Sequence, residues 1–188
     1  HDDPDSRSKE RIYVEFEDRG ILDTIYVEEN GDTPVLHVQY KLGSMNKAEW
    51  KVLPDGLLEL NYSYNFNGVV DMMGIQFDYP ESKVRSKKWL GDGPYRVWQN
   101  RMHGAIFGLW ENDYNDPIPG ETFTYPEFKG YFSNTKWMSF NTDEGVISIS
   151  NKNPDASIGV YQPRDGRDKL LYTFPESGIT ILDVIPPV

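Results

Sequence analysis

Residues 84–101 read Val-Arg-Ser-Lys-Lys-Trp-Leu-Gly-Asp-Gly-Pro-Tyr-Arg-Val-Trp-Gln-Asn-Arg and are the most informative stretch of this chain. They begin with the pattern of a strand, which we expect to break at Gly91-Asp92-Gly93-Pro94. A Gly-x-Gly-Pro sequence is typical of a turn that needs a positive φ and then a φ fixed near about −65°. We therefore expect the aromatic and arginine side chains that follow, among them Tyr95 and Trp98, to be held at a defined place.

Short alternating runs of apolar and polar residues lie on both sides of this stretch. The clearest covers residues 57–66, where Leu58, Leu60, Tyr62, Tyr64 and Phe66 alternate with mostly polar residues, as in a half-buried strand. Asn30-Gly31 and Pro54-Asp55-Gly56 are turn signals. We expect further strands at residues 11–17, 21–28, 35–40, 72–78, 84–90, 105–110, 131–140, 146–150, 157–161, 170–174 and 179–184.

The pattern predicts an all-β, antiparallel fold. Nearly every gap between the runs holds Gly, Pro, Asn or Asp, and no apolar stripe follows a helical period. About a dozen strands exceed the number in an immunoglobulin-like domain and favour a large sandwich of two packed sheets. We expect residues 11–188 to form one domain, after an unpatterned polar lead over residues 1–10.

The composition limits the classes of partner. A formal net charge of −11 and a pI near 4.7 argue against nucleic acid and anionic membrane surfaces, which are bound through Lys and Arg. No apolar run approaches the ~20 residues that span a bilayer. Because the chain has no cysteine, it has no disulfides, thiolate metal sites or Cys nucleophile. A neutral ligand or a protein partner fits this charge better.

The polar residues do not predict a catalytic centre. His1, His37 and His103 stand in no metal-ligand spacing, and neither a Gly-x-Ser-x-Gly elbow nor a phosphate-binding glycine loop occurs. Residues 111–116, Glu-Asn-Asp-Tyr-Asn-Asp, offer oxygen ligands for Ca²⁺ but lack the spacing and central Gly of an EF-hand. We interpret them as an acidic loop, with cation binding left open, and predict no catalytic residue, metal or cofactor.

Aromatic side chains are the better signal of a ligand. Sugars present flat faces of C–H groups that pack on aromatic rings, while nearby polar side chains bind the hydroxyls. Large aromatics in β-sandwiches are also common core residues, so both interpretations remain open. The aromatics near expected strand ends and loops are Trp89, Tyr95, Trp98, Trp110, Tyr114 and Trp137.

The stretch 73–101 also resembles a known family. Met73-Gly74-Ile75-Gln76-Phe77, the strand 84–90, Gly91-Asp92-Gly93-Pro94 and Trp98-Gln99-Asn100-Arg101 are similar in order and spacing to the C-terminal, small-chain β-sandwich domain of family 2 β-galactosidases. There an Arg-Ile-Gly-Leu strand precedes Val-x-Trp-x-Gly-x-Gly-Pro-x-Glu-x-Tyr-x-Asp-Arg. Downstream, Tyr125-Pro126, Gly130 and Lys136-Trp137-Met138 resemble the family's Pro-Gln-Glu-x-Gly and Arg-Trp-Leu.

The resemblance implies a galactose-mutarotase-like supersandwich whose catalytic carboxylates lie on a separate TIM barrel. It also favours a periplasmic or extracellular location. This chain departs from the family pattern at four positions, with Arg96 for Glu, Trp98 for Tyr, Asn100 for Asp and Phe128 for Glu.

We therefore expect a non-catalytic accessory domain of a β-galactosidase-like glycoside hydrolase, which contacts or supports a site for a galactoside-like carbohydrate beside a catalytic partner domain or chain. Two alternatives remain: a mutarotase-like enzyme with His103 or His37 as acid and a Glu as base, and a pure protein-interaction module. The residues expected to contact carbohydrate are Tyr95, Arg96, Trp98, Arg101, Trp110 and Glu111.

Overall fold

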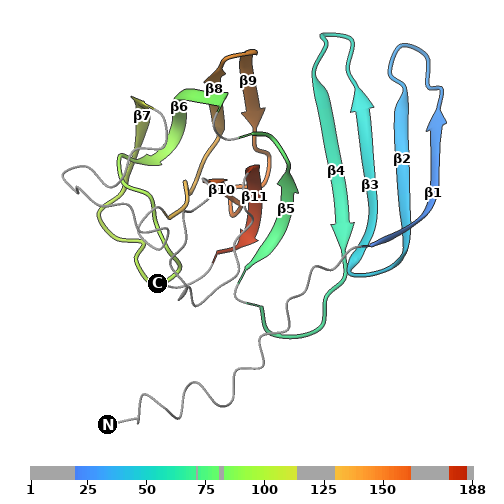
Figure 1. The fold of residues 1–188 in the computed structure, drawn as a ribbon, viewed down its shortest axis with the longest axis horizontal. Helices are drawn as coiled ribbons and strands as arrows, with labels where there is room; N and C mark the ends of the chain where they lie inside the picture. The colour runs from blue at the N-terminus through green and yellow to red at the C-terminus, as the bar shows by residue number, and fades with distance from the viewer. Residues whose placement is uncertain (1–19, 71, 81–82, 114–129, 162–177, 186–188) are drawn as a thin grey trace. The chain divides into compact units, whose positions relative to one another are not determined.

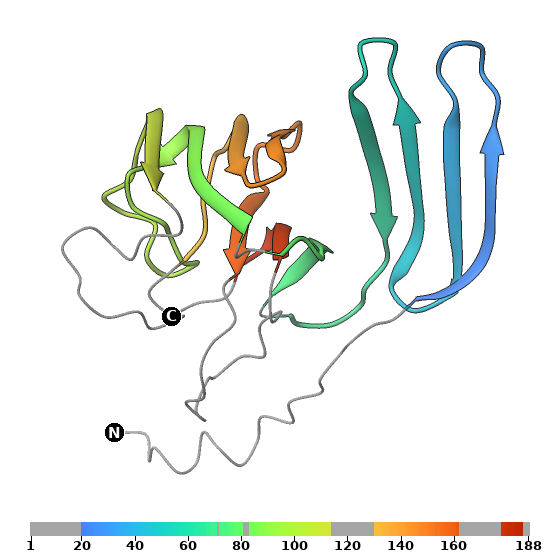
Figure 2. The same ribbon diagram turned by 45° about the horizontal axis from the view of Figure 1, so that its top comes forward.

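The computed structural model describes residues 20–70, 72–80, 83–113, 130–161 and 178–185. These residues contain eleven strands and no α-helix (Figures 1 and 2), so none of their elements is a helix able to cross a membrane. All strand pairs are antiparallel, which confirms the predicted fold class. The strands are β1 (Ile21–Glu28), β2 (Val35–Leu42), β3 (Met45–Val52), β4 (Leu58–Tyr64), β5 (Met73–Phe77), β6 (Val84–Gly93), β7 (Ile106–Asp113), β8 (Trp137–Thr142), β9 (Gly145–Ser150), β10 (Ser157–Tyr161) and β11 (Gly178–Val184).

The chain divides into two compact units, His1–Gly68 and Val69–Val188. The prediction of a single domain over residues 11–188 stays a prediction, and the expected lead over residues 1–10 lies outside the described residues, as do the strands expected at 11–17 and 170–174.

The first unit is a four-stranded meander in the order β1-β2-β3-β4. The Asn30-Gly31 signal lies in the β1–β2 connection, where Gly31 has φ 56° and Thr33 N–H donates to the Asn30 carbonyl (3.0 Å). Pro54 and Asp55 lie inside the β3–β4 turn, which the hydrogen bond from Gly56 N–H to the Leu53 carbonyl closes at 2.9 Å. The two turn predictions are thus confirmed.

Strand β3 is the one element of this sheet that the sequence prediction missed. Its sequence, Met-Asn-Lys-Ala-Glu-Trp-Lys-Val, is rich in residues with low strand propensity. Ala48, Trp50 and Val52 nevertheless alternate with charged residues, and this alternation is the signal that could have found the strand.

The second unit contains two sheets, in the orders β10-β11-β5 and β7-β6-β8-β9. Side chains from both sheets form one core, which makes this unit a two-sheet sandwich. The buried members of that core are Val84, Trp89, Phe132, Met138, Phe140, Ile158, Val160 and Ile179.

The strand expected at residues 131–140 begins later than predicted. β8 starts at Trp137, while Tyr131 and Phe132 form isolated bridges to Val97 and Ile158. These two aromatics are buried at 2% and 1% exposure. These residues are apolar because they are buried in a connection. That connection pairs with Val97, after β6, and with Ile158 in the neighbouring sheet, and it is not part of β8.

Candidate functional site

Strand β6 ends inside the Gly-x-Gly-Pro sequence, three residues later than the expected range 84–90, and without the positive φ that we expected there. The strand continues to Gly93, and neither Gly91 nor Gly93 has a positive φ. Both glycines instead allow neighbouring residues to lie close to the backbone of β6. A Cβ on Gly91 would lie 2.9 Å from the Cα of Thr135, and one on Gly93 would lie 2.6 Å from the indole of Trp110.

Asp92, between these glycines, joins the end of β6 to residues 133–134. Its two carboxylate oxygens accept hydrogen bonds from the Ser133 hydroxyl (3.0 Å) and the Asn134 side-chain amide (3.2 Å). Its backbone carbonyl accepts the indole N–H of Trp89 (2.9 Å). The sequence prediction did not single out Asp92; its place inside the Gly-x-Gly sequence was the available signal.

The segment after Pro94 is anchored on a second cluster of buried side chains. Val97 pairs with Tyr131 through two backbone hydrogen bonds of 2.8 Å. The ring of Trp98, 5% exposed, meets the ring of Tyr131 edge to face, with centroids 5.3 Å apart. Trp98 and Arg101 close the turn that follows, since Arg101 N–H donates to the Trp98 carbonyl (2.9 Å).

Four of the predicted contact residues lie in this anchored segment. Trp98 is buried, whereas Tyr95 is 44% exposed and Arg101 is exposed. The guanidinium carbon of Arg96 lies 5.8 Å from the ring centroid of Phe132, and the side chain is half-buried. Tyr95 and Arg101 are therefore the members of this group that present most surface to solvent.

Trp110 and Glu111 project to opposite faces of β7. The half-buried Trp110 packs against the core, and its indole N–H donates to the Gly91 carbonyl (3.2 Å). Glu111 is exposed and lies 3.4 Å from the ammonium of Lys88, its partner across the ladder. The structure brings Trp110 beside Gly93, at the start of the anchored segment, but places Glu111 on the other side of the sheet.

A buried lysine is a further feature that sequence reasoning missed. Lys87 is 1% exposed, and its ammonium donates to the Asp113 carbonyl (3.2 Å) and lies 6.0 Å from the Phe132 ring centroid. Its register partner Asn112 has a buried Oδ1 with no hydrogen-bond partner. The sequence pattern alone would place a lysine in a strand on a solvated face, whereas here Lys87 is buried beside residues that are distant in sequence, Asp113 and Phe132.

His37 lies in the first unit, between two carboxylates on neighbouring strands. Its Nδ1 is 3.1 Å from Glu49 and its Nε2 is 3.0 Å from Glu28. The ring of Tyr26 stacks on the imidazole, with centroids 4.7 Å apart. Both ring nitrogens are thus already engaged. His103 is exposed, two residues after Arg101.

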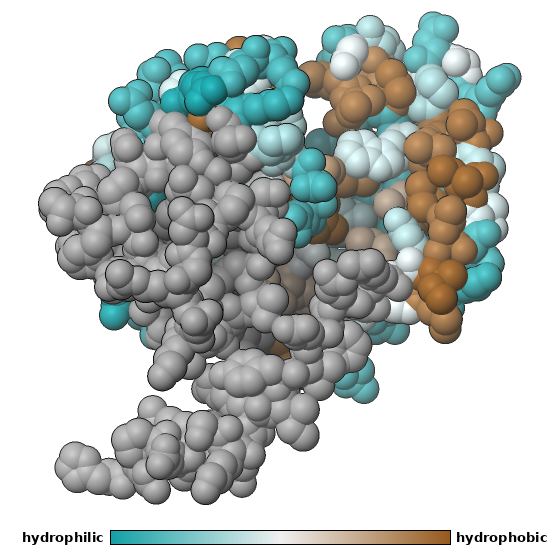
Figure 3. Space-filling view, in the orientation of Figure 1, coloured by the Kyte–Doolittle hydropathy of each residue, from teal (hydrophilic) through white to brown (hydrophobic). Residues whose placement is uncertain are grey.

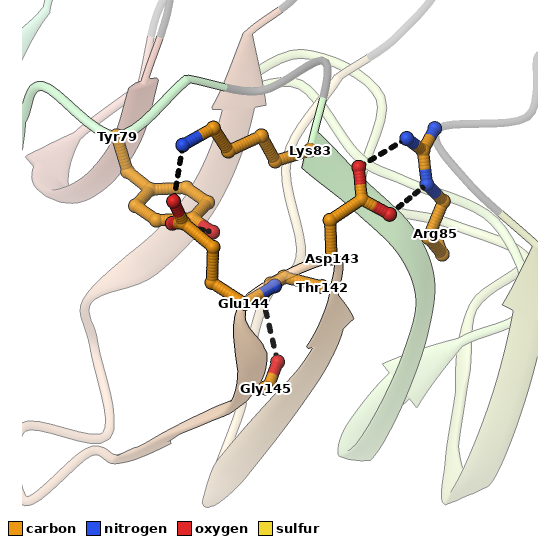
Figure 4. A network of polar contacts seen from close by, with 7 residues as sticks. All are labelled: Tyr79, Lys83, Arg85, Thr142, Asp143, Glu144 and Gly145. Atoms are coloured by element: carbon orange, nitrogen blue, oxygen red, sulfur yellow. Dashed lines mark hydrogen bonds and ion pairs between the residues drawn. The ribbon is translucent and has the colours of Figure 1, made fainter.

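A cluster of charged side chains joins the β8–β9 hairpin to the start of β6 (Figure 4). Arg85 pairs with Asp143 through two hydrogen bonds, and Lys83 with Glu144, which also accepts the Tyr79 hydroxyl (3.1 Å). The hydrogen bond from Arg85 holds the pKa of Asp143 below its ordinary value of 3.8. The bond from Lys83 likewise lowers the pKa of Glu144 below 4.5, and it raises the pKa of Lys83 above 10.5.

Metal binding finds no support in the described part of the chain, where no three His, Asp or Glu side chains form a group that could hold an ion. Only residues 111–113 of the acidic loop at residues 111–116 belong to the described part of the chain.

The second unit is thus an antiparallel β-sandwich that carries a Trp-x-Gly-x-Gly-Pro sequence at the end of β6. The chain belongs to the beta galactosidase small chain family, whose sequence profile matches residues 4–170 of its 188 residues. This match confirms the resemblance found in the sequence. No curated protein matches the chain.

Proposed function

We propose that the chain is a non-catalytic accessory domain of a β-galactosidase-like glycoside hydrolase, which contacts or supports a carbohydrate site beside a catalytic partner. Membership of the beta galactosidase small chain family carries this proposal, because a small chain implies a larger catalytic chain or domain.

The segment 94–101 is the part of the surface best suited to meet a sugar. Burial of Val97 and Trp98 fixes its backbone, while Tyr95 and Arg101 remain exposed. A ring held in this way can stack on a sugar face at low entropic cost, and a guanidinium can bind hydroxyls or a carboxylate. Trp98, Trp110 and the half-buried Arg96 would then act mainly by holding the segment in place.

Glu111 has the least support of the six predicted contact residues. It projects from the face of β7 opposite Trp110 and pairs with Lys88. A contact from Glu111 would require a ligand or partner on the outer face of the sheet.

Intrinsic tryptophan fluorescence tests the carbohydrate contact. Titration with galactose, galacturonate and galacto-oligosaccharides is expected to give a saturable change, since Trp98 and Trp110 lie within or beside the segment. Tyr95→Ala and Arg101→Ala should weaken it. Tyr26→Ala is a matched control, because Tyr26 has the same 44% exposure but lies in the other unit. A flat response of the wild-type chain to every sugar would overturn the carbohydrate contact.

A mutarotase-like activity is the second candidate, because His37 lies within hydrogen-bond distance of two glutamates. General acid–base catalysis needs such groups to face one sugar, and here both imidazole nitrogens are engaged by the protein. NMR of freshly dissolved α-galactose decides the matter. Anomerisation faster than in buffer, abolished by His37→Asn, would support the activity, whereas no acceleration would exclude it.

A further inference from the structure

The longest stretch of this chain without Asp or Glu runs from the end of β6 into β7. Residues 93–110 contain neither, although the whole chain has 30 acidic residues against 19 Lys and Arg. The charged side chains of this stretch at neutral pH are Arg96 and Arg101. The segment 94–101 is therefore locally positive in a chain whose net charge is −11.

Arg101 has no partner for its guanidinium among the described residues. Its two hydrogen bonds with Trp98 are made by the backbone, and no hydrogen bond or ion pair joins its side chain to another described residue. The other arginines in the described part of the chain are engaged, since Arg85 pairs with Asp143 and Arg96 lies over the Phe132 ring. The exposed side chain of Arg101 is thus available to an external anion.

The carboxylates at the two ends of the acid-free stretch do not supply a counter-ion. Asp92 accepts hydrogen bonds from the side chains of Ser133 and Asn134, and Glu111 pairs with Lys88. Exposed charges elsewhere in the chain are largely screened beyond about 8 Å at physiological ionic strength. The acidity of the chain as a whole therefore weighs little against an anion at Arg101.

The backbone of Arg101 is also held in place. Its N–H donates to the carbonyl of Trp98 (2.9 Å), and the side chain of Trp98 is 5% exposed. Directly paired residues share a face, so the side chain of Arg101 starts beside a buried anchor. A guanidinium binds a planar pair of anionic oxygens through two parallel hydrogen bonds, and such charge-assisted bonds are about twice as strong as neutral ones.

We propose that the carbohydrate bound at the segment 94–101 is anionic, and that Arg101 binds a carboxylate or sulfate group on the sugar. This inference rests on the proposed carbohydrate contact and adds the charge of the sugar to it. The exposed side chains gathered over the sheet β1–β4 are hydrophobic, as Figure 3 shows, and would not attract such a group. The unpaired guanidinium is the feature that distinguishes an anionic sugar from a neutral one.

Calorimetric titration of the full chain with galactose, galacturonate and galactose 6-sulfate tests this proposal, because these sugars differ at C6. At least one anionic sugar is expected to bind roughly tenfold more tightly than galactose, the ratio that one charge-assisted hydrogen bond supplies. The tighter of the two identifies the group as a carboxylate or a sulfate. The preference should shrink at high salt.

Two substitutions of Arg101 assign this preference to its side chain. Arg101→Gln removes the charge but keeps the backbone hydrogen bonds of the turn, so the ratio of affinities should fall to about one. Arg101→Lys keeps the charge and should retain part of the preference. Arg85→Gln is the matched control, because Arg85 is exposed but already paired with Asp143, and it should leave the ratio unchanged.

The outcomes separate this proposal from the proposed function. Equal affinity for all three sugars would overturn the anionic ligand and leave the carbohydrate contact standing, whereas no binding of any sugar would overturn both. A preference that survives in Arg101→Gln would overturn the role of Arg101. Inorganic sulfate that binds as tightly as galactose 6-sulfate would also overturn the proposal, because the segment would then bind an oxyanion without its sugar.

Discussion

At the scale of single residues, the glycines of β6 allow close packing. Gly93 lies beneath the Trp110 indole, and Gly91 lies against the backbone at Thr135. Because protein interiors are close-packed, a single added methyl group must displace its neighbours. The Gly-x-Gly sequence therefore sets how closely β7 and residues 133–135 approach β6.

Gly93→Ala is expected to lower the free energy of unfolding by roughly 1–3 kcal/mol, the usual cost of overpacking. Its Cβ would lie 2.6 Å from the Trp110 ring, whereas a Cβ on Gly108 would lie 3.3 Å from the same ring. Gly108→Ala is thus a matched control, for which we expect a smaller decrease in the free energy of unfolding. Urea unfolding of both variants measures the difference, and equal losses would contradict the steric explanation.

Asp92→Ala is expected to destabilise the chain by about 1–3 kcal/mol, because it removes the acceptor of two side-chain hydrogen bonds and leaves their donors without it. Those donors are Ser133 and Asn134. A double-mutant cycle with Ser133→Ala gives the coupling energy. If the loss of stability in the double variant equals the sum of the losses in the two single variants, the Asp92–Ser133 hydrogen bond contributes nothing to stability.

At the scale of elements, the β8–β9 hairpin is tied to the start of β6 by charge as well as by the backbone. Asp143 N–H donates to the Lys83 carbonyl (3.0 Å), beside the Arg85–Asp143 and Lys83–Glu144 pairs (Figure 4). Exposed ion pairs contribute little individually, but these four side chains form one network with opposite charges on two elements.

The network makes stability depend on pH in a defined direction. The pKa values of Asp143 and Glu144 are lowered in the folded state. Their contribution to the free energy of unfolding is therefore complete above pH 3.8 and pH 4.5, respectively, and declines as the pH falls below these values. Because the pKa of Lys83 is raised, its contribution is complete below 10.5 and declines as the pH rises further.

Thermal unfolding of wild type and Asp143→Asn/Glu144→Gln from acid to neutral pH measures this effect. The wild type should be the more stable protein near neutral pH, and the difference should vanish in acid and shrink at high salt. A difference that persists unchanged in acid would contradict the assignment to these carboxylates.

At the scale of the whole molecule, the two units differ in how their apolar residues are packed. In the second unit, residues such as Trp89, Met138 and Ile158 are at most 1% exposed. In the first, no described residue is buried. Local stability follows buried contacts, so we expect the first unit to open more readily than the second.

Hydrogen exchange should show this contrast. Amides of β6, β8 and β11 are expected to exchange slowly and those of β1–β4 faster, because none of the described residues of β1–β4 is buried. Equal protection of both units would contradict this description.

Much of the fold was predictable because it depends on local patterns. The expected ranges 21–28 and 157–161 coincide with β1 and β10, and Asn30-Gly31 lies in the predicted hairpin connection. The candidate site was less predictable. Trp98 and Tyr95 are both large aromatics of one segment, and nothing in their spacing shows that one is buried and the other exposed.

The sequence by itself determined the all-β antiparallel class, most strand positions and the β-galactosidase small-chain family, because alternation, turn residues and a spaced motif are properties of the chain taken in order. Tertiary structure alone decided that Gly91 and Gly93 serve close packing, that Asp92 joins two segments and that Lys87 is buried. Each of these depends on which distant residue approaches: Thr135, Trp110, Ser133 or Phe132. Which distant residues come into contact is decided by how the strands and connections pack together, and local conformational preference does not determine it.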